Sequence, residues 1–265
     1  MIVTVIQFIS RLLFIIAIWY QWKYNRLHHS IYGLSYDMYT ITFTSSLISI
    51  WCSLNYTFSP LVRSQLANRF PLFYPIDEIS KIPISYILLL SDSIIVVGCI
   101  NIFRQLIKYR SSKHIHQGSS KLCVTLIVIF TTFSVFTYTC ASHNLPIDSG
   151  KFGIFYLEHI NYLWVLGNFL CAFKMTPQVS LNWMGQSTSG LSSRFVVFSF
   201  FSFVIELLGT MLLYNERNYF QIPFNHQPIF VTLIQLILVC IIFYQAQYLY
   251  WGVKPYLPKG KSFVV

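Results

Sequence analysis

The stretch "KMTPQVSLNWMGQSTSGLSSRF", residues 174–195, interrupts a strongly apolar chain where a long hydrophobic segment ends. A second stretch, "YQWKYNRLHHSIYGLSYD" at residues 20–37, carries the same polar and small residues at the same spacing. The matched pairs, each 157 residues apart, are Gln21 with Gln178, Asn25 with Asn182, Ser30 with Ser187, Gly33 with Gly190, and Ser35 with Ser192. Five matches in one register indicate an internal duplication.

The composition is that of a membrane protein. The chain has 265 residues, of which 55% are hydrophobic and only 10% are charged, whereas a soluble domain carries about 25% charged residues. Apolar segments at about 3–22, 36–57, 83–107, 121–141, 152–173, 195–214 and 229–251 reach the roughly 20 residues that a membrane-spanning helix needs. Because backbone polar groups in lipid must be bonded internally, we expect an all-α polytopic protein with seven transmembrane helices.

The two motifs join segments one to two and five to six. Four crossings separate them, so both motifs have the same orientation in the membrane. We therefore predict a single membrane domain over 1–265 that contains two parallel three-helix repeats. Repeat one covers about 3–107, a linker helix about 121–141, and repeat two about 152–251. Parallel repeats are a recurring plan in transporters.

The net charge of +10 follows the predicted topology. Lys and Arg concentrate in the odd-numbered loops and the C-terminal tail, whereas the even-numbered loops hold only Arg63, Arg69, Lys81, Lys151 and Arg217. Short basic loops stay cytoplasmic. We therefore predict a lumenal or external N-terminus and a cytosolic C-terminus, and we expect no nucleic acid as a partner.

Nothing in the sequence favours a metal, a cofactor or catalysis. The six cysteines form no CxxC pair, so buried free thiols are expected rather than zinc ligands or disulfides. We find no nucleophile–base set and no phosphate-binding glycine loop. The protein is therefore not expected to be an enzyme.

The motif residues have a defined chemistry. Pro177 removes a backbone donor and bends a helix, while Gln178 and Asn182 share one helical face at a spacing of four. Their amides have two possible partners, exposed backbone groups or a polar ligand. The alternative interpretation is a capped loop with no further role.

These residues resemble the PQ-loop signature, and "NRLHHSIYGLSYD" is similar to the first PQ-loop of the cystinosin family. That family comprises seven-helix transporters of lysosomes and vacuoles that export cystine to the cytosol with protons. The resemblance implies a proton-coupled transporter that exports cystine or a related amino-acid-like solute from an acidic lumen, in a vacuolar, lysosomal or endosomal membrane. It also implies substrate or gating roles for Lys174, Pro177, Gln178 and Asn182 and, in the first motif, for Gln21 and Asn25.

The chain departs from the family pattern at three positions. Tyr20 replaces the first proline, and Phe195 and Ser199 stand where cystine transporters carry an Asn and an Asp. These departures leave the solute open. They also keep an alternative from another class, a non-transporting PQ-loop receptor or regulatory protein with a protein partner.

Ionisable residues inside membrane segments are candidates for function because their burial is costly. Asp37 and Asp92 match family acids linked to proton coupling. Glu206 lies two turns beyond Ser199, so it either supplies the missing carboxylate for proton coupling or pairs with a cation such as Arg217. Arg11 either faces the bundle and pairs with an acid or extends to the lumenal surface.

Overall fold

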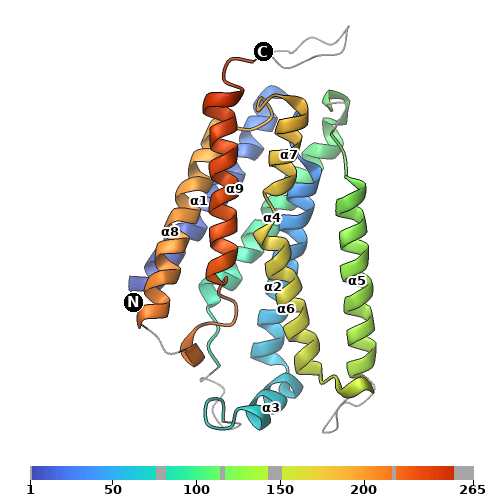
Figure 1. Cartoon of the computed structure of the whole chain (residues 1–265), viewed down its shortest axis with the longest axis vertical. Coiled ribbons are helices and arrows are strands. Elements are labelled where there is room, and N and C mark those ends of the chain that lie inside the picture. The colour runs from blue at the N-terminus through green and yellow to red at the C-terminus, as the bar shows by residue number, and fades with distance from the viewer. Residues whose placement is uncertain (1, 76–81, 114–116, 143–150, 217–218, 254–265) are drawn as a thin grey trace.

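The computed structural model describes residues 2–75, 82–113, 117–142, 151–216 and 219–253, which form helices and turns without a strand (Figure 1). The helices are α1 (Ile2–His28), α2 (Tyr36–Phe58), α3 (Pro60–Arg69), α4 (Tyr86–Lys108), α5 (Lys121–Ser142), α6 (Tyr156–Ala172), α7 (Thr176–Gly185), α8 (Ser193–Glu216) and α9 (Ile229–Tyr244). Short 3-10 turns lie at Arg110–Ser112, Lys151–Gly153 and Tyr219–Gln221, and a π-helical turn, Gln245–Leu249, extends α9. The prediction of an all-α protein is confirmed.

Five of these helices are long and apolar enough to cross a membrane, namely α1, α4, α5, α8 and α9. Helix α2 has 23 residues but is rich in Ser and Thr, which lowers its hydropathy. Helix α6 has only 17 residues. After a short break, α7 continues in roughly the direction of α6 (Figure 1). The described residues thus provide five direct counterparts of the seven expected segments.

One predicted boundary was wrong and another agrees with the structure. Helix α1 does not end near residue 22 but continues to His28, so Gln21 and Asn25 lie within it. Helix α6 ends at Ala172, next to the predicted end at residue 173, and a separate helix, α7, begins at Thr176 with Pro177 in its first turn. Proline is well tolerated there, because the first turn of a helix leaves its amide hydrogens unpaired and the ring presets a helical φ. Pro177 therefore begins a new helix segment after the bend.

The helices pack in an order that differs from their order in the chain. Helix α1 lies along α8, α4 packs on both α1 and α2, and α2 packs on α6. Helix α9 packs against α8 and also contacts α6 and α7. Helix α5 packs mainly on α6 at one edge of the bundle (Figure 1). Elements from the two ends of the chain are therefore interleaved.

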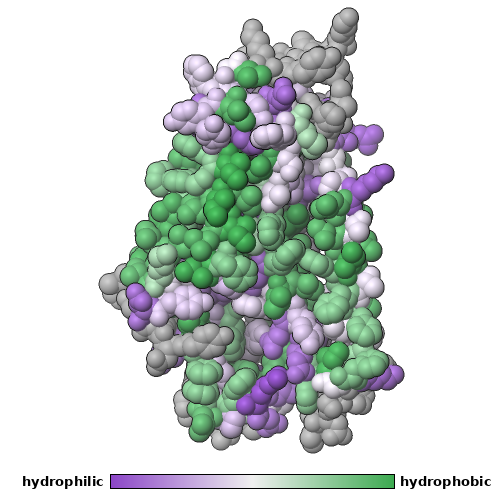
Figure 2. Space-filling model, in the orientation of Figure 1, coloured by the Kyte–Doolittle hydropathy of each residue, from purple (hydrophilic) through white to green (hydrophobic). Residues whose placement is uncertain are grey.

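Apolar residues fill the interior and also cover the outside of the bundle. One core joins α1, α2, α4, α8 and α9 through residues such as Phe14, Met38, Ile102 and Phe195. A second core joins α2, α3 and α6. Large apolar side chains of α5 remain exposed, including Leu122 and Val128. Figure 2 shows hydrophobic residues across the middle of the visible face, with hydrophilic residues gathered toward its two ends, the pattern of a bilayer-facing surface.

Candidate functional site

The first motif binds the second at one end of the bundle. Gln21 Nε2, on α1, donates to the carbonyl oxygen of Gly190 at 3.0 Å, and the backbone amide of Ser192 donates to Gln21 Oε1 at 2.9 Å. Gln21 Nε2 also donates to Asn25 Oδ1 at 2.8 Å, and Asn25 Nδ2 donates to Gln105 Oε1 of α4 at 3.1 Å. Because Ser192 directly precedes α8, Gln21 holds the segment from which that helix starts.

The second motif makes the equivalent hydrogen bonds to the first motif. Gln178 Nε2, on α7, donates to the carbonyl oxygen of Gly33 at 2.9 Å, and the backbone amide of Ser35 donates to Gln178 Oε1 at 2.9 Å. Gln178 Nε2 also donates to Asn182 Oδ1 at 2.8 Å, and Asn182 Nδ2 donates to Gln245 Oε1 at 2.9 Å. Ser35 is the N-cap of α2. Each glutamine thus holds the start of a helix that follows the other motif.

We name this set the reciprocal clasp; it consists of Gln21, Gly33, Ser35, Gln178, Gly190 and Ser192. Both glutamines are fully buried, and Asn25 and Asn182 are buried beside them. In this conformation the amides bind protein groups rather than a solute. The substrate or gating roles expected of these four amides stay predictions, and their bonds place them at a closed end of the bundle.

The two motif glycines bring the backbones into direct contact. Gly33 has a φ of +73°, which a residue with a side chain rarely adopts. A Cβ atom on Gly190 would collide with the carbonyl oxygen of Tyr32 and with the backbone of Gly33. Both glycines are therefore required by the close approach of the two loops.

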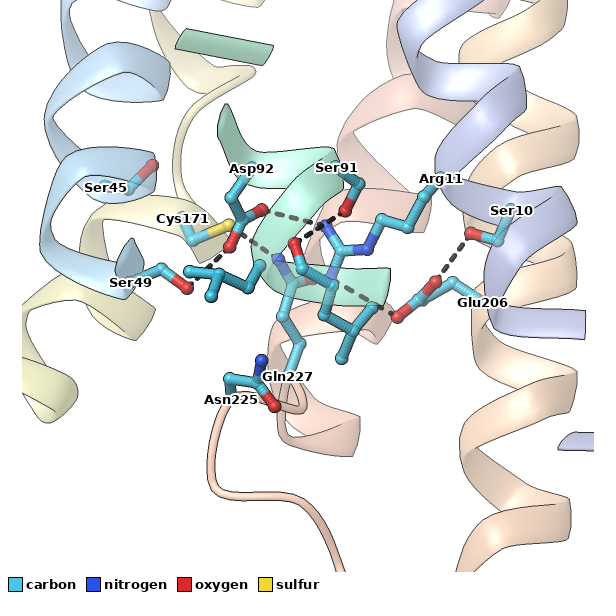
Figure 3. Close-up of polar contacts among 12 residues, drawn as sticks. Ser10, Arg11, Ser45, Ser49, Ser91, Asp92, Cys171, Glu206, Asn225 and Gln227 are labelled. Carbon is cyan, nitrogen blue, oxygen red and sulfur yellow. Dashed lines mark hydrogen bonds and ion pairs between the residues drawn. The ribbon is translucent and has the colours of Figure 1, made fainter. Parts of the chain in front are cut away.

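A cluster of charged residues lies in the interior of the bundle (Figure 3), and its Arg11 is ten residues before Gln21 on α1, about 15 Å along the helix. Arg11 of α1 lies between two acids: its Nη1 is 3.9 Å from Asp92 Oδ1 of α4, and its Nη2 is 3.5 Å from Glu206 Oε1 of α8. Ser49 Oγ donates to Asp92 Oδ2 at 2.6 Å, and Ser10 Oγ donates to Glu206 Oε2 at 2.6 Å. All three charged side chains are at least nine-tenths buried. Arg11 thereby links α1 to both α4 and α8.

Lys174 enters this region from the break between α6 and α7. It is only 3% exposed. Its Nζ lies 4.0 Å from Cys171 Sγ and 4.2 and 5.1 Å from the ring centres of Phe14 and Phe203. Within the described part of the chain it has no ion pair. The ammonium is therefore a buried cation held by ring faces and a thiol.

A narrow chamber connects these groups. Arg11, Asp92 and Lys174 line it, together with a row of small polar residues on α2 that includes Ser45 and Ser49. The chamber extends along α2 and α6 toward the opposite end from the clasp, where residues such as Tyr56 and Phe224 line it. It encloses about 40 Å³, enough for about three water molecules. Glu206 does not line it and instead lies behind Arg11.

The predicted proton-coupling acids occupy two different places, with Asp92 and Glu206 on either side of Arg11 and Asp37 elsewhere. Asp37 lies in the first turn of α2, where the backbone amide of Ser120 donates to both of its carboxylate oxygens at 3.2 and 3.0 Å. It is 12 residues before Ser49, about 18 Å along the helix, so it does not join Asp92 and Glu206. Arg217, the cation suggested from the sequence as a partner of Glu206, lies outside the described residues. Among the described residues, the cation that pairs with Glu206 is Arg11.

The positions that depart from the family pattern are accommodated in the core. Phe195 is 2% exposed and belongs to the main apolar cluster. Ser199 Oγ is buried and has no hydrogen-bond partner within the part of the chain that the structure describes. Tyr20 stacks on Phe198, with ring centres 5.3 Å apart, and Arg194 lies over the Tyr20 ring. These contacts are apolar or stacking contacts where the family pattern has a proline or polar groups.

Sequence reasoning left the direction of Arg11 open and missed His226. Arg11 faces the bundle, and its isolated charge in an apolar segment was the available signal. His226 lies in the connection between α8 and α9, buried between Gln7 Nε2 at 2.9 Å and Thr210 Oγ1 at 3.2 Å. Burial lowers the pKa of His226 to about 4. No local pattern marks it, because its partners come from α1 and α8.

The described residues contain no group of three or more His, Cys, Asp or Glu side chains placed to hold a metal ion. All six cysteines are free, as expected, and only Cys240 is exposed.

Comparison with known proteins gives two matches. Residues 160–218 match a family model described as a PQ loop repeat, a span that starts in α6 and contains the second motif. The chain is also 50% identical over 262 residues to the uncharacterized protein YCL002C of Saccharomyces cerevisiae, covering 98% of this chain and 100% of that protein. This second similarity spans nearly the whole length of both chains.

The contact between the motif glycines can be tested with Gly190→Ala. Because the new methyl group meets backbone rather than a flexible side chain, we expect the free energy of unfolding in detergent to fall by about 3 kcal/mol or more. Gly118→Ala is the matched control, since its Cβ meets only the end of the Lys113 side chain, and it should change stability by less than about 1 kcal/mol. Equal effects of the two substitutions would contradict the role of the contact.

The buried ion cluster can be tested with a double-mutant cycle. Arg11→Met and Glu206→Gln each leave a buried charge poorly paired, so each should lower the free energy of unfolding by about 3–5 kcal/mol. The double variant leaves only Asp92 and Lys174, whose charges balance. Its loss should be smaller than the sum of the single losses by at least about 1 kcal/mol. Arg69→Met, which removes an exposed partner of Glu158, is the control and should cost about 1 kcal/mol or less.

The neutral state of His226 predicts a pH dependence of stability. The unfolded chain binds a proton at this imidazole below about pH 6.5, whereas the folded chain binds it only near pH 4. The contribution of neutral His226 to the free energy of unfolding is therefore fully present above pH 6.5. It falls by about 3 kcal/mol as the pH decreases from 6.5 to 4. The unfolding temperature should drop between pH 7 and pH 5, and His226→Gln should reduce that drop. An unchanged drop would assign the pH dependence to other groups.

Proposed function

Because the chain belongs to the same family as the yeast relative and carries a PQ-loop repeat, we propose that it is a proton-coupled membrane transporter. It exports a small amino-acid-like solute, cystine or a related molecule, from an acidic lumen to the cytosol. The PQ-loop family includes transporters, which agrees with this assignment. The substrate and the coupling to protons are our inference from the site.

One observation carries the proposal: a buried chamber lined by Asp92, Arg11 and Lys174 lies among helices from both motifs. Buried charges around a polar cavity inside a membrane bundle are characteristic of solute and proton pathways. The chamber contains a carboxylate that can take up a proton and cations that can bind a carboxylate. These are the two chemical functions that a proton-coupled amino-acid carrier needs.

The proposed topology has seven crossings. Helix α2 and the pair α6–α7 cross the membrane in addition to the five apolar helices, and α3 lies at the lumenal end. Their Ser and Thr residues face the chamber or the helix backbone, as Ser49 and Thr42 do, which explains the low hydropathy of α2. The two three-helix repeats are then α1, α2 and α4, and α6–α7, α8 and α9, with α5 as the linker. The N-terminus is lumenal and the C-terminus cytosolic.

The mechanism is alternating access between the two repeats. The reciprocal clasp closes the cytosolic end, and the chamber extends from the charged cluster toward the lumen. Release to the cytosol requires the clasp to separate, and the break between α6 and α7 before Pro177 provides the bend. Lys174 lies at this break, so movement of α7 changes the position of a charge in the chamber. Gln21, Asn25, Gln178 and Asn182 gate the exit in this scheme.

Asp92 is the proposed proton carrier. It lines the chamber, whereas Glu206 lies behind Arg11 and keeps that cation in place. Asp37 lies near the clasp and would respond to opening of the cytosolic end. The organelle that fits an acidic lumen is a vacuole, lysosome or endosome.

A non-transporting receptor or regulatory protein is the second candidate. The observation that favours it is that the clasp amides are bonded within the protein and that the chamber is too small for an amino acid in this conformation. A receptor would keep this closed form, bind a protein partner and move no solute.

Asp92→Asn tests the transport proposal in reconstituted vesicles. Acidifying the lumenal side should accelerate export by the wild-type protein by about tenfold per pH unit, up to saturation. Because an amide does not take up a proton in this pH range, the variant should lose this acceleration. It should still fold, as judged by gel filtration. Radiolabelled cystine, glutamate and lysine report the flux. A strong pH response in Asp92→Asn would remove Asp92 from the pathway, and absence of any flux together with a stable protein partner would favour the receptor.

A further inference from the structure

The charges around the chamber indicate which class of solute it can hold. Four buried charged residues form the cluster, two cationic (Arg11 and Lys174) and two acidic (Asp92 and Glu206). With no solute bound and each side chain in its ordinary ionised form, their charges sum to zero. The chamber surface itself is unbalanced, because it includes both cations but only the Asp92 carboxylate. Glu206 neutralises Arg11 from the other side.

A buried cluster must remain near neutrality while a solute crosses. During alternating access the site is closed to water on both sides, and a net charge in such a place costs several kcal/mol. A proton on Asp92 changes the sum to +1. A solute of charge −1 then restores neutrality, whereas a zwitterion leaves +1 and a cationic amino acid gives +2.

Two groups have free capacity to bind an anion. Lys174 Nζ lies 4.0 Å from a thiol and faces two aromatic rings, and Arg11 Nε is buried without a hydrogen-bond partner among the described residues. The Arg11 Nη atoms also lie 3.9 Å from Asp92 Oδ1 and 3.5 Å from Glu206 Oε1. Both distances exceed the about 2.7–2.9 Å of a charge-assisted hydrogen bond. Its guanidinium thus has donors that a solute carboxylate can engage when Asp92 is neutral.

We propose that the chamber carries a small organic anion of net charge −1, an acidic amino acid or a similar carboxylate, together with one proton on Asp92. The step is electroneutral. This inference rests on the proposed transport function and specifies its substrate class. Cystine, whose net charge is zero at lumenal pH, is then a poor solute, in agreement with Phe195 and Ser199 at the positions where cystine transporters carry polar groups.

Other groups around Asp92 do not change this balance. The titratable or charged residues that face it are Arg11 from α1, Cys52 and Tyr56 from α2, Cys171 from α6, Lys174 from the α6–α7 break, Glu206 from α8, and His226 from the connection between α8 and α9. Cys52, Tyr56 and His226 are buried, which favours their neutral forms. The only exchange of charge at the chamber surface is therefore between Asp92 and the solute.

The test measures equilibrium accumulation by the full-length protein in sealed vesicles. Radiolabelled L-glutamate, L-cystine and L-lysine are offered separately under an imposed pH gradient or an imposed potential of 100 mV. We expect L-glutamate to accumulate about tenfold per pH unit, since one proton accompanies each solute. We expect the potential to leave that ratio unchanged, because an electrogenic step moving one charge would shift it about fiftyfold.

Three variants sharpen the assignment. Asp92→Asn should carry L-glutamate without a proton, so its accumulation should follow the potential and lose its dependence on the pH gradient. Lys174→Met should reduce L-glutamate uptake at least tenfold, and Lys174→Arg, which keeps the charge, should retain most of it. Lys121→Met, at an exposed position on α5, is the matched control and should transport like wild type.

The outcomes separate the two proposals. Accumulation of L-cystine or L-lysine that depends on both the pH gradient and the potential would overturn the anion inference and keep proton-coupled transport. L-glutamate accumulation that responds to potential in the wild-type protein would also overturn it. Absence of flux for all three solutes would count against the transport function itself. If Asp92→Asn does not fold, the wild-type potential measurement decides alone.

Discussion

The crossed hydrogen bonds of Gln21 and Gln178 constrain the whole bundle, because each glutamine holds the segment that starts a helix after the other motif. Gln21 binds the Gly190 carbonyl and the Ser192 amide, and Gln178 binds the Gly33 carbonyl and the Ser35 amide. Unpaired amides at a helix start are costly in a membrane. The clasp satisfies them with side chains from the other half of the chain, and α1 and α8 are thereby brought side by side along their length.

The packing of α1 on α8 in turn brings opposite charges together. Ser10 and Arg11 face Glu206 across that contact, and Arg11 also reaches Asp92 on α4. In the register of 157 residues, Glu206 corresponds to Ser49, the residue that donates to Asp92. The first half therefore has a hydroxyl at the position where the second half has an acid. Asp92 lies on the chamber surface and Glu206 lies behind Arg11.

Much of the fold could be predicted from local patterns. Long apolar segments indicated the helices, and the duplicated motif indicated the Gln–Asn spacing on one helical face. The end of α1 and the restart of the helix at Thr176 could not be predicted, because polar residues such as Gln21 and Asn25 look like a loop until their buried partners are known. Asp37 and Asp92 gave similar signals in the sequence. Their different surroundings, Ser120 for one and Arg11 with Ser49 for the other, depend on packing.

The sequence by itself determined that this is an all-helical membrane protein in which five polar or small residues recur at one spacing, since hydropathy, length and residue spacing are local properties. Only the tertiary structure decided that each motif glutamine binds the backbone of the other motif, that Arg11 lies between Asp92 and Glu206, and that Lys174 faces the chamber. Those outcomes join residues from 81 to 195 positions apart (Arg11 to Asp92 and Arg11 to Glu206). The physical reason is that a buried charge or amide acquires its partner only when distant helices pack, and no spacing within one segment records that partner.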